Sequence, residues 1–283
     1  MCSRCSRTVS AIDFVRRLPG KSQAALVEAS DHHQYVVKWM NAPRAIICLR
    51  MEALRNSVYE LLGLPVSAWT PIEVSDQLID AAPEMRIHTA IGPVRPVAGI
   101  HFASRVVCDP PETSYEALQP HLYDRVVNRL DFWGAYTLDV WTERFDVRQA
   151  VFAPSGNSGE LKAFFIDHGN SSGCMRASRE TGFVPCLYPD KRIYVQEEMI
   201  AVIHEWILHV QRNGRSAIQT AYERMPPDWR TASVEALGDQ FTDRIRHLRD
   251  LIFPPIQRVP VKARFSGSER FPVRMLLRVG QIA

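Results

Sequence analysis

Two short apolar runs, separated by a cluster of turn-forming residues, constrain the fold of this chain more than any other feature. The runs cover residues 149–153 and 161–166, and the residues between them read Pro-Ser-Gly-Asn-Ser-Gly. Strand-like segments joined by such residues are typical of a β-hairpin. Gly156 and Asn157 fit a two-residue turn, and a longer loop is equally compatible. We therefore expect an antiparallel hairpin within residues 138–170.

Two aspartates flank this hairpin at its open end, one just before the first strand and one just after the second. If the turn centres between Gly156 and Asn157, antiparallel pairing places Asp146 directly opposite Asp167, at roughly 4.5–5.5 Å between Cα atoms. Two carboxylates this close repel each other unless a cation or a shared proton separates them. A divalent metal with phosphate oxygens would satisfy both carboxylates. Two solvated aspartates at loop ends are the alternative.

The composition is that of an ordinary globular protein. The 283 residues are 46% hydrophobic and 23% charged, which allows a substantial core in one or two lobes. The net charge of +3 is too small to indicate direct binding of nucleic acid. No apolar run reaches the roughly 18–20 residues of a membrane span, and the N-terminus has no apolar segment of signal-peptide type. We expect a cytoplasmic protein that does not enter a membrane.

The six cysteines are scattered along the chain and do not suggest a disulfide scaffold. Cys2 and Cys5 have the spacing of half a zinc site, but no second pair completes it. Free thiols are therefore the favoured interpretation.

The first third of the chain contains a lysine among apolar neighbours. Gly20, Ser22 and Gln23 precede a strand expected over residues 24–29, and they form either a phosphate-binding backbone or an ordinary turn. In the next expected strand, over residues 35–40, alternation puts Tyr35, Val37 and Trp39 on one face and Lys38 on the other, and neither face is polar. The Lys38 ammonium must reach either water or an anion, because burying it unpaired is costly.

A helix expected over residues 45–62 follows and ends at Gly63. Glu52 lies on the flank of its apolar stripe, where it either reaches a lysine on the neighbouring strand or is solvated. Further strands are expected at residues 72–74, 77–79 and 99–107, and the chain is punctuated by prolines at 110 and 111.

The remainder of the chain is expected to be mainly helical. Apolar stripes predict helices over residues 115–130, 199–210 and 233–252, with Gly214 ending the second and Ser233 capping the third. A shorter helix is expected over residues 216–224. Residues 170–191 are interpreted as a regulatory or substrate loop, or as a plain connector. The tail from residue 256 is basic and either contacts an acidic partner or is solvated.

Several short motifs follow one another in a fixed order along the chain. In the second half they are Leu138-Asp139-Val140-Trp141, the run from Asp146 to Phe152, and Ile166-Asp167-His168-Gly169. In the first half they are Gly20-Lys21-Ser22-Gln23, Tyr35-Val36-Val37-Lys38, Asn41-Ala42-Pro43, Glu52, Leu62-Gly63-Leu64-Pro65-Val66, and Gly99-Ile100-His101-Phe102-Ala103-Ser104-Arg105. This ordered set resembles the HipA-like kinases, bacterial relatives of the protein-kinase fold, and the resemblance covers roughly residues 18–170.

This resemblance implies an α+β, two-lobed protein-kinase-like fold. The N-lobe would cover residues 1–109, with a small antiparallel sheet and one helix. The mainly helical C-lobe would cover residues 110–283 and include the hairpin and the basic tail. The implied activity is ATP-dependent phosphoryl transfer to a serine or threonine hydroxyl of an unidentified protein substrate, with Mg²⁺.

The resemblance also implies the roles of individual residues. Lys38 would bind the α- and β-phosphates of ATP, and Glu52 would orient Lys38. Asp146 would position or deprotonate the acceptor hydroxyl, and Asp167 would hold Mg²⁺ with Gln149 as the second metal ligand. Gly20, Ser22 and Gln23 would approach the phosphates, and the backbone near Val107 would contact adenine.

Three positions depart from the family pattern. Arg144 replaces an asparagine two residues before the catalytic aspartate, Val151 replaces the second metal ligand, and His168 replaces a phenylalanine or tyrosine. Arg144 would instead neutralise the aspartates and support nucleotide binding without turnover. A nucleotide-binding pseudokinase and a small-molecule kinase are therefore alternatives. The family also often pairs with an antitoxin-type DNA-binding protein, which no residue here indicates.

Overall fold

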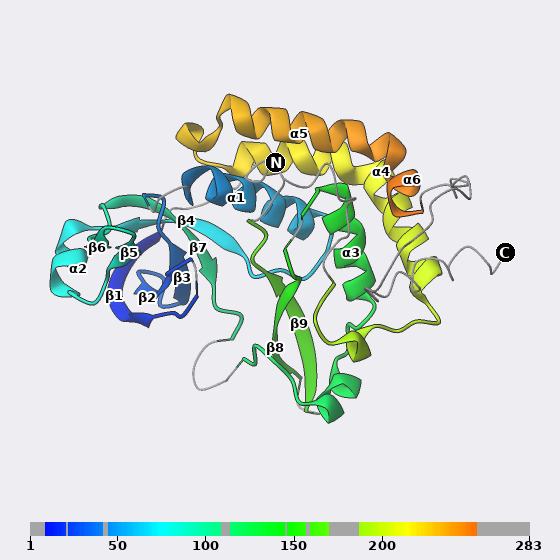
Figure 1. Cartoon of the computed structure of the whole chain (residues 1–283), viewed down its shortest axis with the longest axis horizontal. Helices are drawn as coiled ribbons and strands as arrows, with labels where there is room; N and C mark the ends of the chain where they lie inside the picture. The colour runs from blue at the N-terminus through cyan, green and yellow to red at the C-terminus, as the bar shows by residue number, and fades with distance from the viewer. Residues whose placement is uncertain are drawn as a thin grey trace, which may run out of the picture.

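Five strands form a closed barrel in the first part of the chain. The computed structural model describes residues 9–20, 22–41, 45–108, 114–144, 146–156, 159–169 and 187–253. The barrel order is β1-β2-β3-β7-β4, antiparallel except where β1 meets β4 in parallel and closes it. The strands are β1 (Val9–Arg17), β2 (Ala25–Ala29), β3 (Gln34–Lys38), β4 (Trp69–Val74) and β7 (Gly99–Arg105) (Figure 1).

Alternation along β3 gives Lys38 its unusual position. Tyr35, Val37 and Trp39 are buried in the hydrophobic cluster inside the barrel, as the sequence predicts. Lys38 points the other way and pairs with Phe102 of β7, whose ring centroid lies 5.8 Å from the Lys38 Nζ. Phe102 belongs to a second, larger hydrophobic cluster. Lys38 is thus directed from the barrel wall toward the rest of the molecule.

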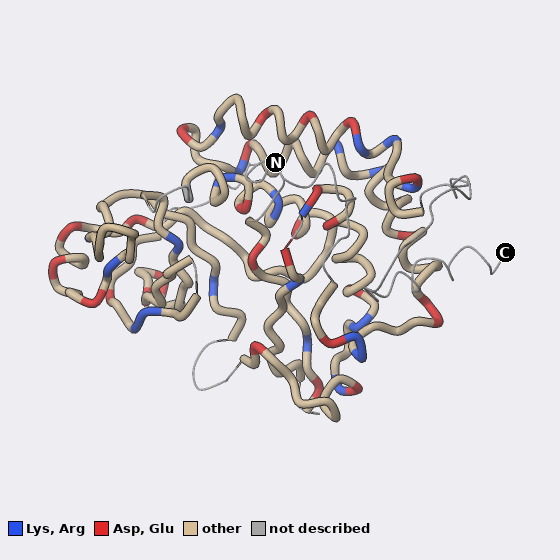
Figure 2. The backbone as a smooth tube through the Cα atoms, viewed as in Figure 1, with Lys and Arg blue, Asp and Glu red and all other residues tan. Residues whose placement is uncertain are grey.

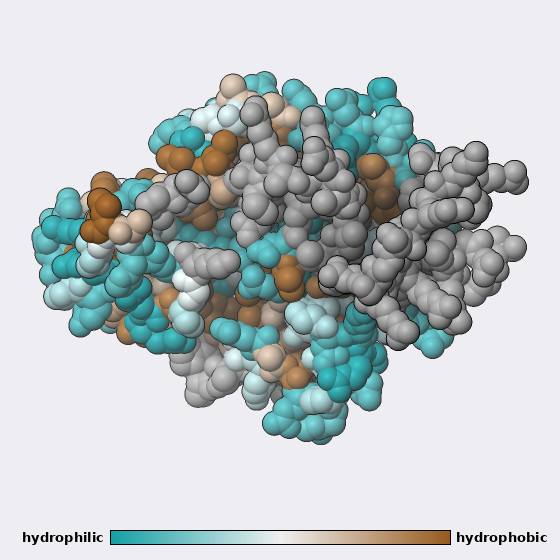
Figure 3. Space-filling view, in the orientation of Figure 1, coloured by the Kyte–Doolittle hydropathy of each residue, from teal (hydrophilic) through white to brown (hydrophobic). Residues whose placement is uncertain are grey.

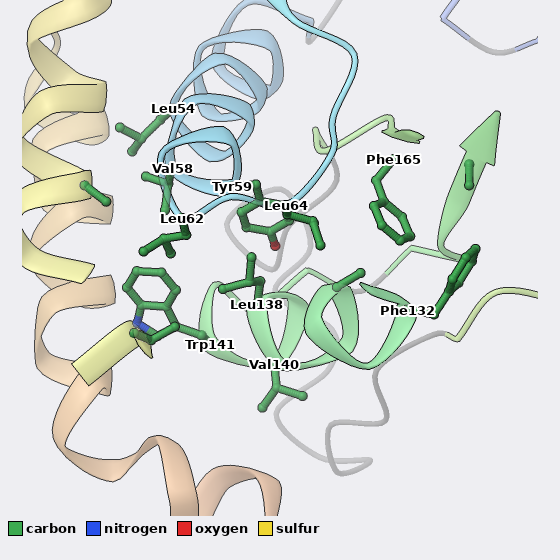
Figure 4. Packing of buried hydrophobic residues seen from close by; sticks show 14 of the residues in the cluster. Leu54, Val58, Tyr59, Leu62, Leu64, Phe132, Leu138, Val140, Trp141 and Phe165 are labelled. Atoms are coloured by element: carbon green, nitrogen blue, oxygen red, sulfur yellow. The ribbon is translucent and has the colours of Figure 1, made fainter. Parts of the chain in front are cut away.

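The helix α1 (Ala45–Leu61) lies beside the barrel but packs on other helices. It contacts α4 and α5, and its buried residues join the larger cluster (Figures 1 and 4). Gly63 ends it as predicted, in a left-handed conformation with φ +85°. The Gly63 N–H donates to the Glu60 carbonyl, and the Leu64 N–H donates to the Tyr59 carbonyl. This pair of bonds is a Schellman cap.

The predicted hairpin consists of β8 (Gln149–Ser155) and β9 (Glu160–Ile166). Three isolated β-bridges add to this two-stranded sheet, from Tyr115 to Phe152, from Val126 to Leu161, and from Val66 to Phe165. The last bridge ties the segment after α1 to the strand that ends just before Asp167. The first part of the chain is therefore fastened to the hairpin close to its open end.

The helix α3 (Asp131–Trp141) lies beside the hairpin on the side away from the barrel, and α5 (Ala232–Arg244) with much of α4 (Met199–Arg224) runs above α1 (Figure 1). The short α6 (Leu248–Ile252) follows in the chain. In Figure 4, Leu138 and Trp141 of α3 face Val58 and Tyr59 of α1, and Leu62 just after it, across the larger cluster. The remaining short elements are α2 (Asp76–Ala81), β5 (Ile87–Thr89), β6 (Gly92–Val94), η1 (Pro120–Arg125), η4 (Lys191–Ile193), η5 (Pro227–Trp229) and η6 (Ile245–His247).

The strand predicted at residues 77–79 is wrong, because these residues lie in the helix α2. The Ser75 hydroxyl accepts a hydrogen bond from the Leu78 N–H at 3.2 Å, so Ser75 caps the helix. This local signal outweighs the short apolar run that suggested a strand. The strands β5 and β6, which follow α2, were not predicted.

The helix predicted over residues 115–130 is also wrong, because only the 3₁₀ helix η1 forms there. The Tyr115 N–H donates to the Phe152 carbonyl, and the Val127 N–H donates to the Leu161 carbonyl, each at 2.8–2.9 Å. Flanking residues thus complete the edges of the hairpin, and Pro120 limits any longer helix.

The break predicted at Gly214 does not occur, since α4 runs without interruption from Met199 to Arg224. A Cβ at Gly214 would lie 3.1–3.2 Å from side-chain atoms of Ile245 and Trp141. Gly214 therefore allows close packing instead of ending a helix. The helix predicted over residues 233–252 is divided into α5, η6 and α6, and its N-cap is Thr231 instead of Ser233.

Charged residues are mixed over the described chain. Figure 2 shows Lys and Arg interspersed with Asp and Glu along the backbone, and in Figure 3 hydrophilic residues predominate over the described part of the visible face. Among the described residues, the longest apolar helical stretches fall short of what a bilayer crossing requires. The Cys2–Cys5 pair, most of the loop predicted over residues 170–191 and the basic tail lie outside the described residues.

Candidate functional site

The structure brings Lys38 and Glu52 into direct contact. The Lys38 Nζ lies 2.6 Å from the Glu52 Oε1, and the two side chains are only 13% and 3% exposed. Lys38 comes from the barrel strand β3 and Glu52 from the middle of α1. The flank position predicted for Glu52 therefore reaches the lysine on the neighbouring strand.

Asp167 completes a three-residue contact from distant parts of the chain. Its Oδ1 lies 3.1 Å from the Lys38 Nζ, and its Oδ2 accepts a hydrogen bond from the Gln149 Nε2 at 2.9 Å. Gln149 begins β8 and pairs with Ile166 at the end of β9. The open end of the hairpin thus presents Asp167 and Gln149 to the lysine on the barrel.

Asp146 and Asp167 are not directly opposed, and this prediction is wrong. The strands pair Gln149 with Ile166 and Ser155 with Glu160, so the loop covers residues 156–159 instead of two residues. Glycines in left-handed conformations, with φ +72° and +71°, stand at both ends of that loop and allow its length. One step further along this register, the position opposite Asp167 is Arg148.

Arg144 joins the two aspartate segments through their main chains. Its guanidinium donates to the Asp167 carbonyl from Nε at 3.0 Å and from Nη2 at 2.8 Å. It also donates to the Asp146 carbonyl at 2.8 Å and to the Val147 carbonyl at 3.2 Å. The Asp146 carboxylate accepts a hydrogen bond from the Val147 N–H at 2.9 Å and is half-buried. Arg144 thus forms its hydrogen bonds with the backbone of both segments, and its charge also stabilises the Asp167 carboxylate, as predicted for that aspartate.

A buried polar network lies behind these residues. Asp139 of α3 accepts hydrogen bonds from the Tyr59 hydroxyl at 2.9 Å and from Arg148 at 3.1 Å, and its other oxygen lies 3.5 Å from Arg144. Arg148 donates in turn to the Ile166 and Asp167 carbonyls. Asp139 therefore anchors two buried guanidinium groups that both reach the Asp167 main chain.

Sequence reasoning did not assign a role to Asp139, Arg148 or Arg55, which donates to the Thr142 and His168 carbonyls. Arginine is usually exposed, and a sequence does not show which carbonyls a buried guanidinium will meet. Asp139 had one signal, its place in the quoted Leu-Asp-Val-Trp run.

The pKa values of the two carboxyl groups that contact Lys38 are shifted in opposite directions. Burial acts to raise the pKa of Asp167, but Lys38, Arg144 and Arg148 outweigh it, so the pKa is lowered. Complete burial raises the pKa of Glu52 despite the opposing charge of Lys38. Burial acts to lower the pKa of Lys38, yet both carboxylates outweigh it and the pKa is raised. Asp167 is accordingly held as the carboxylate and Lys38 as the ammonium.

Gly169 makes room for the Glu52 carboxylate. A Cβ at this position would lie 2.8 Å from the Glu52 Oε2, which is closer than side-chain contacts allow. The preceding residue, His168, is wholly buried and lies 5.0 Å, between ring centroids, from Tyr59 in an edge-on arrangement. Burial and the nearby Arg148 and Arg144 charges lower the pKa of His168 well below its ordinary value.

The loop before β2 has the backbone of a tight turn. Gly20 and Gln23 have φ values of +114° and +50°, and the Gln23 N–H donates to the Gly20 carbonyl at 3.3 Å. Both polar ends of the Gln23 side chain bond to the main chain of His88. Ser22 is exposed. The Gln23 side chain therefore fastens the loop to β5 instead of pointing to Lys38.

Val107 follows β7 and is half-buried, next to a Val106 N–H that donates to the Gln34 carbonyl at 2.8 Å. The neighbouring Asp109 lies outside the described residues, so the structure describes only the start of the segment expected to contact adenine.

The donor set fits Mg²⁺ bound together with phosphate. The described residues contain no group of three or more His, Cys, Asp or Glu side chains placed to hold a metal. Mg²⁺ usually takes one or two carboxylates, with waters and substrate phosphates supplying the other oxygens. Asp167 supplies a carboxylate, and the amide oxygen of Gln149 is not used in the bond between these two residues.

Solved structures resemble this fold at low sequence identity. A chain from the complex of the Shewanella oneidensis MR-1 toxin–antitoxin system HipA, HipB and its operator DNA matches with a TM-score of 0.51 and 9% identity, over 84% of this chain and 68% of that one. The proinflammatory kinase CtkA of Helicobacter pylori matches with a TM-score of 0.49 and 11% identity, over 86% and 94%. The Golgi casein kinase with Mn/ADP bound matches at 0.47 and 11%, over 87% and 73%.

No protein-family model matches the chain, and no curated protein sequence matches it. The first of these structural matches supports the resemblance to the HipA-like kinases at the level of the fold alone. The expected mixed α and β, kinase-like fold agrees with it.

Proposed function

We propose that this chain is a two-lobed phosphotransferase that uses ATP and Mg²⁺ and acts on a serine or threonine hydroxyl of a protein. The observation that carries this proposal is the contact of Lys38 with both Glu52 and Asp167, which are 14 and 129 residues away in the chain. A largely buried lysine shared by two carboxylates, where the barrel meets the hairpin, suits phosphate binding beside a metal ion.

Each of these residues has a distinct proposed role. Lys38 binds the α- and β-phosphates, and these bonds replace its bond to Asp167. Glu52 keeps the lysine directed into the site, because its own position is fixed by the packing of α1. The barrel residues, with α1, correspond to the proposed N-lobe at 1–109, and the hairpin and helices to the C-lobe at 110–283.

Asp167 and the Gln149 amide oxygen are the residues that would hold Mg²⁺. The metal would neutralise phosphate charge and help to orient the transferred group. Gln149 takes the part that Val151 cannot, since valine has no ligand atom. Because Asp167 is held as the carboxylate, its oxygens are available to a cation once Lys38 moves to phosphate.

Asp146 is proposed to orient the acceptor hydroxyl and accept its proton. Arg144 joins the main chain of Asp146 to that of Asp167, so the same arginine would position both the acceptor and the metal. The Gly20–Gln23 turn, with Ser22, is proposed to cover the phosphates with its backbone, and the backbone around Val107 to contact adenine.

The decisive test is transfer of labelled phosphate from ATP to the chain itself or to proteins of an extract. Lys38→Ala and Asp167→Ala should each reduce transfer by at least about 10²-fold, since each removes charge stabilisation of the reacting phosphoryl group. Lys162→Ala on β9 and Asp239→Ala on α5 are the matched controls and should retain transfer. Circular dichroism should show that all four variants are folded.

Unchanged transfer in Lys38→Ala or Asp167→Ala would reject the assignment. Label that appears only on small molecules would instead favour a small-molecule kinase. An antitoxin-type partner, proposed from the family resemblance, would be recognised by co-purification.

A nucleotide-binding module without transfer activity is the second candidate. It is favoured by Val151, which supplies no ligand at the second metal position, and by the engagement of both Asp167 oxygens with Lys38 and Gln149. Thermal stabilisation by ATP distinguishes the two candidates. A shift that is the same with and without Mg²⁺ would favour the module, whereas a shift that needs Mg²⁺ supports the enzyme.

A further inference from the structure

The backbone of Asp167 has a conformation that the surrounding residues must impose. Asp167 has φ +55°, in the left-handed region that residues with a Cβ adopt only rarely. The residue follows β9 directly, so the turn redirects the chain at the point where its carboxylate meets Lys38. Such a conformation persists where neighbouring groups fix it.

Arg144 supplies much of that restraint. Two of its N–H groups converge on the Asp167 carbonyl, and others reach the Asp146 and Val147 carbonyls at 2.8 and 3.2 Å. The side chain is wholly buried and lies against Asp139, which balances its charge. A planar guanidinium can serve three carbonyls in fixed directions, which a lysine ammonium on a flexible stem does less well.

We propose that Arg144 is a positioning residue that holds the Asp167 backbone so that the carboxylate faces Lys38 and Gln149, and that fixes Asp146 relative to it. This inference rests on the proposed function and extends it to the residue that departs from the family pattern. The asparagine expected at this position has a shorter side chain with a single amide group. Here the longer arginine side chain contacts Asp139 of α3 and reaches both aspartate segments.

The bonding pattern separates this role from general stabilisation of the core. Arg244 also donates to main-chain carbonyls, those of Val140 and Trp141, each at 2.7 Å, but it does not contact Asp167. Replacing either arginine should lower the free energy of unfolding. Only the loss of Arg144 should alter what Asp167 binds.

The test compares Arg144→Lys with Arg244→Lys in the full chain. Mg²⁺ is titrated in the presence of ATP, and the thermal shift gives the apparent metal affinity. Arg144→Lys should weaken that affinity by roughly tenfold or more, as losses of supporting groups around metal ligands commonly do. ATP binding without Mg²⁺ should change by less than about twofold, and Arg244→Lys should leave the metal affinity unchanged.

Hydrogen exchange of residues 166–169 provides a readout that needs no ligand. Faster exchange there in Arg144→Lys, but not in Arg244→Lys, is expected. If Arg144→Lys does not fold, Asp139→Asn replaces it, because this change removes the charge that anchors Arg144. Asp139→Asn should also weaken the apparent Mg²⁺ affinity and speed hydrogen exchange in residues 166–169.

The outcomes keep the two proposals apart. A wild-type chain that does not respond to ATP and Mg²⁺ would reject the proposed function, and exchange in residues 166–169 would still show whether Arg144 holds the backbone. A wild-type chain that responds, together with Arg144→Lys or Asp139→Asn of unchanged metal affinity and exchange, would overturn the role of Arg144.

Discussion

At the scale of single residues, the contact between Gly169 and Glu52 gives a sharp test of the site. Gly169→Ala would place a methyl group 2.8 Å from the Glu52 Oε2, so the carboxylate must shift from its present position beside Lys38. We expect phosphoryl transfer to fall by roughly tenfold to a hundredfold, because small displacements at a reacting centre have effects of this size. The measurement is the rate of labelled transfer at saturating ATP.

A glycine elsewhere in the larger cluster provides the control. Gly238→Ala on α5 places its methyl group 3.2 Å from Ile218, away from Lys38, and should leave transfer unchanged. If Gly169→Ala were as active as the wild-type chain, Glu52 would not need its present position.

The residues that the sequence could indicate are those that short motifs carry. Lys38, Glu52 and Asp167 each lie in a quoted segment of the family resemblance, and the structure brings all three together. The frame of Asp139, Arg144 and Arg148 could not be derived in the same way. Its function depends on main-chain carbonyls that meet it only after α3 and the hairpin have packed.

At the scale of elements, α3 and α4 approach closely at a glycine. A Cβ at Gly134 would lie 2.4–2.7 Å from atoms of the Trp206 ring. Gly134→Ala should therefore lower the free energy of unfolding by roughly 1–2 kcal/mol, since overpacking outweighs the gain in helix propensity of about 1 kcal/mol. Urea denaturation followed by circular dichroism measures the change.

A double-mutant cycle identifies the cause. In a Trp206→Leu background, where the ring is absent, Gly134→Ala should cost little or should stabilise the helix. An equal cost in both backgrounds would mean that the Trp206 ring is not what excludes a larger residue.

Predictions of elements succeeded where local pattern and tertiary contacts agree. The strands around Lys38, the helix α1 and the hairpin were recognised from alternation, helical spacing and turn residues. Residues 115–130 failed because Tyr115 and Val126 bridge to the hairpin, a contact that no local pattern records. Gly214 failed for a similar reason, because its neighbours Trp141 and Ile245 come from other elements.

At the scale of the whole molecule, the two hydrophobic clusters are joined next to the site. β3 contributes Val37 to the barrel cluster, and Phe102, which pairs with Lys38 in the neighbouring strand, belongs to the larger one. The α1 helix packs with the larger cluster while its Glu52 reaches the barrel lysine. The predicted boundary near residue 109 remains a prediction, because that residue lies outside the described part of the chain.

One buried neutral histidine lies beside each cluster, which makes the stability of the whole molecule sensitive to acid. The His101 Nδ1 accepts a hydrogen bond from the Met40 N–H, and its Nε2 donates to the Val97 carbonyl, so the ring is neutral. Burial lowers the pKa of His101, although the bond to Val97 opposes it, and burial with the Arg148 and Arg144 charges lowers that of His168.

Acidification from pH 7.5 to 5.5 should therefore destabilise the fold. The unfolded chain takes up protons at both histidines near pH 6.5, while the folded chain takes them up only at lower pH, so stability is lost as the pH falls through that value. Each histidine that stays neutral contributes a loss of about 1.4 kcal/mol at pH 5.5. Denaturation by urea at the two pH values measures the total change, and His168→Phe should reduce the loss by about 1.4 kcal/mol, the contribution of one histidine.

The comparison between variants isolates the histidine because the other shifted groups remain in both chains. Glu52 has a raised pKa, so the folded state gains stability from its protonation as the pH falls, which opposes the histidine effect. Asp167 has a lowered pKa, and its contribution is lost only below about pH 4. A pH dependence that is the same in His168→Phe and in the wild-type chain would mean that His168 becomes charged in the folded state, and that the arginine frame around it tolerates another cation.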